Sequence, residues 1–230
     1  MLEKKLVRSF VAKYNTPNPA VNPLKSGPTH LKPTRSKAGE VIARDYLRKE
    51  LNVSFAGRMS LEEEDADLQK RGIDNFGFIF KEENNQLELQ KVVICEVKAS
   101  ESYKNPPDVV SKNVDSLYNS LLDLSKGSDR LMKALTKSFD RFDVERYTAL
   151  IVDLICDIDT NNDLQDTRKK MLIVPFLLRT ATTYNSDDFG IFYTDPTEFD
   201  GTIINYYIMV LDAPLSDFSD DLYSQIRGEN

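Results

Sequence analysis

A chain of 230 residues, 40% of them hydrophobic, is long enough to bury a real core in one large or two small domains. Two cysteines exclude a disulfide framework, and a single histidine excludes a histidine-based triad and the usual zinc sites. A net charge of −7 argues against tight unaided binding of long DNA, because duplex affinity depends on phosphate neutralisation. With no membrane-length apolar stretch and no signal-peptide pattern, we expect a cytoplasmic protein without a membrane partner.

Positive charge is concentrated at the start of the chain. Residues 1–49 contain eleven Lys and Arg against three Asp and Glu. Repeated prolines between residues 15 and 33 predict an extended, basic lead-in over residues 1–35, followed by a single domain over residues 36–230. Several basic side chains either flank a DNA cleft or form an ordinary solvated face. They are Lys25, Lys32, Arg35, Lys37, Arg44, Arg48 and Lys49.

An amphipathic helix is predicted from Ala38 to about Leu51. Its apolar stripe consists of Ile42, Ala43, Tyr46, Leu47 and Leu51. Glu40 falls on the same side of the helix as this stripe, where a carboxylate needs a partner. That partner is either a functional site or a basic residue such as Lys98 or Arg71.

Two apolar segments that carry acids predict a pair of neighbouring strands. Asp74 to about Phe80 and Leu87 to Lys98 have strand character, and the polar residues 81–86 between them predict a turn. Because side chains alternate along a strand, Glu96 and Lys98 should share one face while Val97 points away. Pairing of the strands would then bring Asp74 beside Glu96.

These residues together suit a metal-dependent phosphodiesterase. Asp74, Glu96 and the backbone carbonyl of Val97 supply the oxygen ligands that Mg²⁺, or Mn²⁺ in its place, prefers. Lys98 would orient or deprotonate the attacking water and stabilise charge on the phosphate. The simpler interpretation of Glu96 and Lys98 is a solvated strand end, because an acid, any residue and a lysine often occur together by chance.

The region after this motif alternates between helical and strand patterns. One helix is predicted from Pro107 to Gly127, and a helical elaboration follows over about residues 127–165. The first helix has a buried stripe of Val110, Val114, Leu117, Leu121 and Leu124. The elaboration comprises a helix over residues 128–142 and a segment over 144–158 that is either helix or strand. Residues 157–161 imitate the start of a calcium loop without its glycine or closing glutamate, and they predict a polar loop.

Two further strands and a short helix complete the predicted elements. The strands are Met171 to Leu178 and Ile203 to Leu211, and the helix lies near residues 219–226. Pro175 cannot donate to a strand ladder, so it predicts an edge strand or a bulge.

The order helix, strand, strand with an acid, strand with acid-x-lysine, helix resembles the PD-(D/E)xK nuclease core. In this comparison Ile73-Asp74 stands for Pro-Asp, and Glu96-Val97-Lys98 is the second half of the motif. The resemblance implies an α/β fold, namely a restriction-endonuclease-like core with a central mixed sheet flanked by helices and with a helical insertion. In these enzymes the helix before the core strands often supplies a glutamate near the metal, which implies that role for Glu40.

Longer segments resemble HamA, the family of nuclease subunits of the bacterial Hachiman anti-phage system. The matching segments are Ala38-Gly39-Glu40, Gly72-Ile73-Asp74, Cys95 to Ser100, Ile173 to Leu178 and Ile208 to Leu215. This resemblance implies an effector nuclease that a helicase-like ATPase, HamB, holds and releases onto DNA. The chain has no Walker-type phosphate loop of its own. Two alternatives remain: an inactive nuclease-fold module that binds the ATPase, and a stand-alone restriction-type endonuclease.

Overall fold

The computed structural model describes residues 31–56, 73–111, 114–127, 129–139, 142, 145–161, 164–190, 192, 199, 201–218 and 221. Within these residues five strands form one mixed sheet. The strands are β1 (Asn75–Glu83), β2 (Gln86–Ala99), β3 (Met171–Thr180), β4 (Ile203–Ile204) and β5 (Tyr207–Leu211). β1 is antiparallel to β2, β3 is parallel to β2, and both β4 and β5 are parallel to β3.

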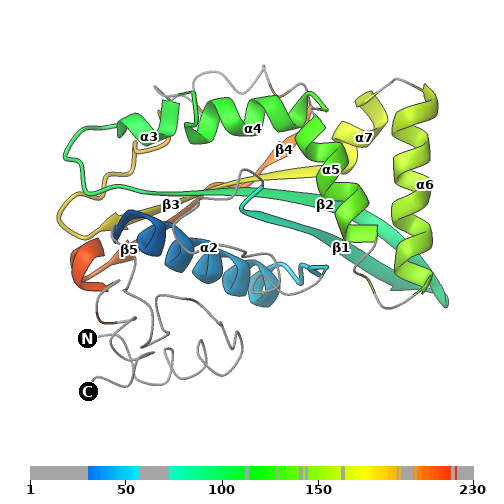
Figure 1. Cartoon of the computed structure of the whole chain (residues 1–230), viewed down its shortest axis with the longest axis horizontal. Helices are drawn as coiled ribbons and strands as arrows, with labels where there is room; N and C mark the ends of the chain where they lie inside the picture. The colour runs from blue at the N-terminus through cyan, green and yellow to red at the C-terminus, as the bar shows by residue number, and fades with distance from the viewer. Residues whose placement is uncertain are drawn as a thin grey trace, which may run out of the picture.

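Helices cover both faces of this sheet (Figure 1). They are α2 (Leu31–Glu50), α3 (Asp108–Ser111), α4 (Leu117–Ser125), α5 (Asp129–Phe139), α6 (Glu145–Asn161) and α7 (Leu164–Lys170). α2 lies on one face, and α3 and α4 lie on the other (Figure 1). The predicted α/β class, with a central mixed sheet flanked by helices, is confirmed. No described helix is both long and apolar enough to cross a membrane.

The alternation of side chains along β2 divides the core into two clusters. Val93, Cys95 and Val97 pack with α2, whereas Val92 and Ile94 pack with α4, α5 and α6. The even positions of β2 therefore face α4, and this periodicity carries Glu96 to the same side.

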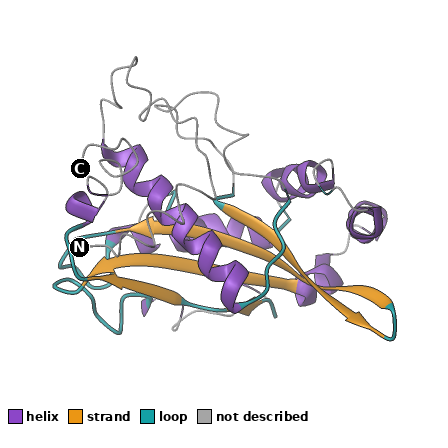
Figure 2. Cartoon of the chain, turned by 90° about the horizontal axis from the view of Figure 1, so that it is seen from below, coloured by secondary structure: helices purple, strands orange, loops and turns teal. Residues whose placement is uncertain are grey.

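The β1–β2 hairpin extends from the body of the sheet as a long twisted ribbon (Figure 2). Its turn is tighter than the predicted 81–86, because Asn84 and Asn85 take φ values of 53° and 62° and close it in two residues. Asn tolerates this left-handed conformation better than most residues. The register places Asn75 opposite Cys95, which fixes where β1 begins relative to the acid-x-lysine motif.

The element order of the nuclease core includes one more strand, before the strand that carries Asp74. Among the described residues this strand is represented only by a bridge between Ser54 and Phe78. Ser54 and Phe78 exchange backbone hydrogen bonds of 2.7 and 2.8 Å. Gly77 makes this approach possible, since a Cβ there would lie 2.6 Å from Val53 Cγ1 and 2.8 Å from Ser54 O.

Several predicted boundaries were wrong. α2 begins at Leu31, so residues 31–35 are helical and not extended, which the first-turn position of Pro33 permits. The helix predicted from Pro107 to Gly127 is divided into α3 and α4. The Ser116 side chain caps α4 by accepting from Asn119 N, and Val114, predicted to be buried, is 87% exposed in the break.

The helical elaboration is present as α5, α6 and α7. The segment predicted over residues 144–158 is helix, not strand, over its described residues 145–158, which belong to α6. Residues 157–161, predicted as a polar loop, are the last turns of the same helix. Their short polar side chains led to the prediction of a loop, but the helix that the preceding apolar positions form continues through them.

The prediction that Pro175 marks an edge strand or a bulge was also wrong. β3 is an interior strand, regularly paired with β2 through Glu96 and Pro175. The carbonyl of Ile173 accepts from Asn205 N, so by strand alternation the Pro175 nitrogen faces that side as well. There the pairing is interrupted between β4 and β5, and no ladder donor is lost.

Other predicted features lie outside the described residues. They are the lead-in over residues 1–30, Arg71, Gly72 and most of the short helix near residues 219–226.

Candidate active site

Asp74 lies immediately before β1 and is directed at β2. Its Oδ2 accepts a hydrogen bond of 2.7 Å from Val97 N. Because the strand register begins at Asn75 and Cys95, the Asp74 carboxylate takes the place that a further β1 carbonyl would occupy. The N–H and C=O of one residue in such a pair point to the same side, so the Val97 carbonyl also faces the region beside Asp74.

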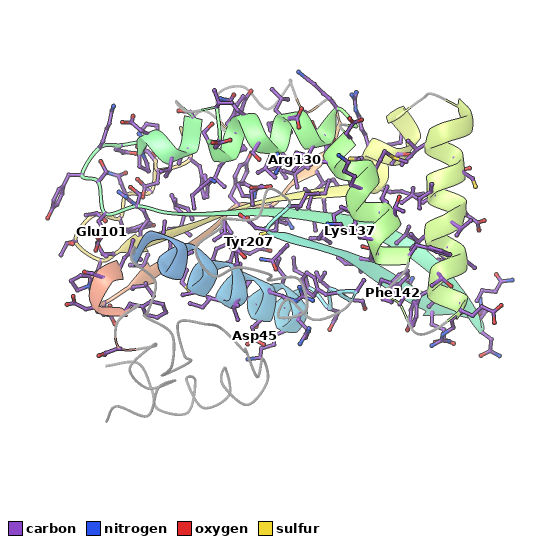
Figure 3. All side chains as sticks on the ribbon, viewed as in Figure 1. Asp45, Glu101, Arg130, Lys137, Phe142 and Tyr207 are labelled. Carbon is purple, nitrogen blue, oxygen red and sulfur yellow. The ribbon has the colours of Figure 1, made fainter. Side chains whose placement is uncertain are left out.

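Glu96 is held on the α4 side of the sheet by residues from two helices. Arg130 Nη2 donates to Glu96 Oε1 over 3.0 Å, and Arg130 Nη1 donates to Ser120 Oγ over 3.1 Å. The Ser120 hydroxyl is also hydrogen-bonded to Glu96. The Glu96 side chain is only 4% exposed, whereas that of Arg130 is 37% exposed. Figure 3 places Arg130 at the beginning of α5, next to the sheet.

Both carboxyl groups have raised pKa values, and the charge of Glu96 contributes to the shift at Asp74. The pKa of Asp74 is raised to about 7, first by burial and then by the negative charge of Glu96. Burial likewise raises the pKa of Glu96 to about 7, against the lowering effect of Arg130 and then of Lys98. Near neutral pH the pair therefore holds its negative charge at a cost, which a bound cation would relieve.

Lys98 completes the acid-x-lysine motif at the end of β2. It is half-buried and shares a strand face with Glu96. Its positive charge lowers the pKa of both Asp74 and Glu96, so the ammonium group acts on both carboxyls. The structure thus brings together Asp74, Glu96, Val97 and Lys98, as the sequence predicted.

Glu40 enters this region from α2, on the other side of the sheet. Gly39 allows the helix to approach, because a Cβ there would lie 3.2 Å from Val97 Cγ1 and 3.3 Å from Leu178 Cδ1. The Glu40 backbone carbonyl accepts from Asn75 Nδ2 over 2.8 Å, which ties α2 to the first residue of β1. Its side chain is half-buried, and its charge raises the pKa of Glu96.

The oxygen atoms available for a metal are those of two carboxylates and one carbonyl. Within the described part of the chain, no three or more Asp, Glu, His or Cys side chains are grouped as they would be to hold a metal ion. Glu40 is therefore close enough to act electrostatically without being placed as a third side-chain ligand. A metal at this site would rely on Asp74, Glu96 and the Val97 carbonyl, with water completing its coordination.

The basic residues that the sequence predicts on a DNA cleft or a solvated face differ in their surroundings. Arg44 is buried, with its guanidinium 4.4 Å from the centre of the Phe55 ring, so both interpretations, a residue flanking a DNA cleft and a residue on a solvated face, were wrong for Arg44. Lys49 pairs with Asp45 on the same helix at 2.5 Å. Lys25 and the side chains of residues 32, 35 and 37 lie outside the described part of the chain.

Sequence reasoning missed Arg130 and Ser120. Arg130 is 34 positions from Glu96 and shares its helix with Lys133 and Lys137, so nothing in the sequence distinguishes it. The packing of α5 beside α4 and β2 places Arg130, and not the two lysines, next to Glu96. A long-range ion pair of this kind can be found only once the helices are placed.

Comparison with protein-family models, with curated proteins and with solved structures finds no match for the chain.

Proposed function

We propose that this chain is a metal-dependent DNA nuclease whose site is built on Asp74, Glu96 and Lys98. The observation that carries the proposal is the pair of adjacent carboxyls, one half-buried and one buried, with pKa values raised to about 7. Strongly perturbed carboxyls beside a specific cation are typical of functional sites. A purely structural strand end would expose these charges to water.

The donor atoms suit Mg²⁺ or Mn²⁺. Asp74, Glu96 and the Val97 carbonyl are hard oxygen ligands, and the repulsion between the carboxylates would be offset by a divalent cation. When bound, the metal would lower the pKa of a coordinated water and neutralise charge that develops on the phosphate. The arrangement therefore fits phosphodiester hydrolysis.

The chain's own side chains have separate parts in this proposal. Lys98 acts on both carboxyls and would orient or deprotonate the attacking water while stabilising charge on a phosphate oxygen. Val97 N–H holds Asp74 in one orientation through the 2.7 Å hydrogen bond. Glu40 would act from α2, either through hydrogen bonds around the site or through its negative charge on a second ion.

We further propose that the nuclease is the effector of a Hachiman-like anti-phage complex in the cytoplasm, held by a HamB-like helicase or ATPase. The resemblance of the sequence to HamA supports this proposal. The acidic balance of the chain, with a pI near 4.9, also supports a partner that grips DNA. The elaborations after residue 126 would bind that partner, outside the strands that carry the site.

One observation favours a second candidate, an inactive nuclease-fold module. Glu96 already has a cationic partner in Arg130, as expected of a carboxylate that never binds metal. In this case the chain would bind and restrain the ATPase without cutting DNA.

A plasmid assay separates these functions. The purified chain, alone and with its ATPase partner, is incubated with supercoiled plasmid in Mg²⁺, Mn²⁺ or EDTA, with Asp74→Asn as the matched control. We expect metal-dependent nicking that Asp74→Asn reduces by about 10² or more. Absence of cleavage by the chain and by the complex would favour the inactive module. Full activity of the lone chain at physiological salt, with no copurifying ATPase, would favour a stand-alone endonuclease.

A further inference from the structure

Arg130 occupies an unusual position for an ion-pair partner of a buried acid. It comes from α5, outside the strands of the motif, and it contacts Glu96 at 3.0 Å and Ser120 at 3.1 Å. Its charge also lowers the pKa of Asp74, so the guanidinium acts electrostatically on both carboxyls. At 37% exposed against 4% for Glu96, it is the member of the pair that solvent reaches.

We propose that Arg130 is an exchangeable counter-ion of this site: it pairs with Glu96 in the metal-free protein and binds a phosphate oxygen of the DNA once metal has taken Glu96. This inference rests on the proposed nuclease function and adds a substrate-binding residue to it.

The exchange follows from charge. A divalent ion held by Glu96 would repel the guanidinium and weaken its contact with Oε1. Because its side chain is partly exposed, Arg130 can turn toward solvent without becoming a buried, unpaired cation. The Ser120 hydroxyl can keep its hydrogen bond to Nη1 and so hold the side chain at the edge of the site.

Arginine suits a contact with a DNA phosphate as well as the contact with Glu96. Its planar guanidinium presents paired donors that match a phosphate as well as a carboxylate. A phosphate bound beside Asp74 and Glu96 would place negative charge where the guanidinium already lies. The same side chain therefore has a partner in each state.

The exchange makes two predictions of opposite sign for Arg130→Gln. Metal should bind more tightly, because a competing cation has been removed, with the Mn²⁺ Kd falling about fivefold. DNA should bind more weakly when Ca²⁺ holds the site without cleavage, with the Kd rising about tenfold and the salt slope falling by about 1. A residue that only stabilises the fold would not tighten one ligand while loosening the other.

The experiment measures Mn²⁺ binding by calorimetry and labelled-duplex binding by fluorescence anisotropy, at pH 8. The variants are Arg130→Gln, Arg130→Lys and the matched control Lys137→Gln. Lys137 is exposed and lies two turns further along α5 (Figure 3), so its loss changes net charge equally. Thermal unfolding checks that each variant is folded.

We expect the paired change for Arg130→Gln, a smaller one for Arg130→Lys and none for Lys137→Gln. Equal loss of DNA affinity in Arg130→Gln and Lys137→Gln would overturn the inference, because general charge would then explain it. Unchanged affinities in Arg130→Gln, with metal binding and cleavage intact, would also overturn it and leave the nuclease proposal standing. A wild-type chain that binds no Mn²⁺ and cuts no DNA would overturn both.

Discussion

Two arginine–carboxylate pairs are built on neighbouring strands, and they differ in how completely they are closed. Arg179 on β3 pairs with Asp188 at 2.8 Å, and both side chains are 0% exposed. Arg130 pairs with Glu96 on β2 at 3.0 Å, but its side chain is 37% exposed. The first pair is sealed inside the fold, and the second is open on the arginine side.

The sealed pair joins loops at the ends of two strands. Arg179 donates to the carbonyls of Ser100, Ser102 and Thr183 in addition to Asp188. Asp188 Oδ2 also accepts from Asn185 N at 3.0 Å. This network fixes the chain just after the acid-x-lysine motif to the chain just after β3.

The open pair has different surroundings. Glu96 lies beside Asp74, a second carboxyl whose pKa is raised by the negative charge of Glu96, and the arginine that pairs with Glu96 comes from a helix outside the sheet. We infer that the sealed pair stabilises the fold and that the open pair belongs to the proposed nuclease site.

The largest expected effect is on stability, from Arg179→Met. Removing this arginine leaves Asp188 buried without its cation and three carbonyls without their donor. We expect the free energy of unfolding to fall by about 3–5 kcal/mol. Arg130→Met should cost less, because the guanidinium is partly in water and Glu96, with a pKa of about 7, can take up a proton when its cation is lost. Urea unfolding followed by circular dichroism measures both, and equal losses would refute the division.

The second prediction compares carboxamide variants of the two acids. Glu96→Gln should reduce cleavage by about 10² while leaving stability at pH 8 unchanged or higher, because a buried charge is removed and Arg130 remains hydrated. Asp188→Asn should lower stability by about 3 kcal/mol and change the rate per folded molecule little. Plasmid cleavage, normalised to the folded fraction, is the measurement. A sharp loss of stability in Glu96→Gln would mark that residue as structural.

The third prediction concerns pH. Asp74 and Glu96 have folded-state pKa values of about 7, above the ordinary 3.8 and 4.5. The folded chain then binds more protons than the unfolded chain between these limits, so the stabilisation from protonated carboxyls is complete below about pH 4 and lost as pH rises through 7. For Glu96 alone the loss is on the order of 3 kcal/mol.

Mg²⁺ should reverse that loss above pH 7 and have little effect at pH 5, because it binds only the ionised carboxylates. Unfolding measured from pH 5 to 8, with Mg²⁺ or EDTA, tests this relation. Asp74→Asn combined with Glu96→Gln serves as control and should flatten the curve. A wild-type profile as flat as that of the double variant would show that the pair does not titrate near neutrality.

The smallest effect is expected for Glu40→Gln. The half-buried carboxylate acts on the site through its charge, and its structural link to Asn75 uses the backbone carbonyl, which the variant keeps. We expect cleavage to fall by about tenfold with little change in stability. Glu50→Gln, an exposed position on the same helix, is the matched control and should change neither. An unaltered rate in Glu40→Gln would remove it from the site.

The sequence alone determined the local parts of this protein. The strand period put Glu96 and Lys98 on one face, and the spacing of two apolar segments placed Asp74 beside them, because hairpin pairing is a short-range relation. The break before α4 was missed, since Val114 fits the helical spacing and only the Ser116 cap reveals the helix start. The metal, the substrate and the ATPase partner remain predictions.

Only the tertiary structure decided which residues, distant in the chain, pack or pair with these strands. Pro175 is tolerated inside the sheet because β4 and β5 leave a gap in pairing where its nitrogen points. Arg130 and Arg179 acquire opposite characters from the amount of water that packing leaves around them. An ion pair depends on its dielectric surroundings, and those are set by helices and loops tens of residues away in the chain, which no local pattern records.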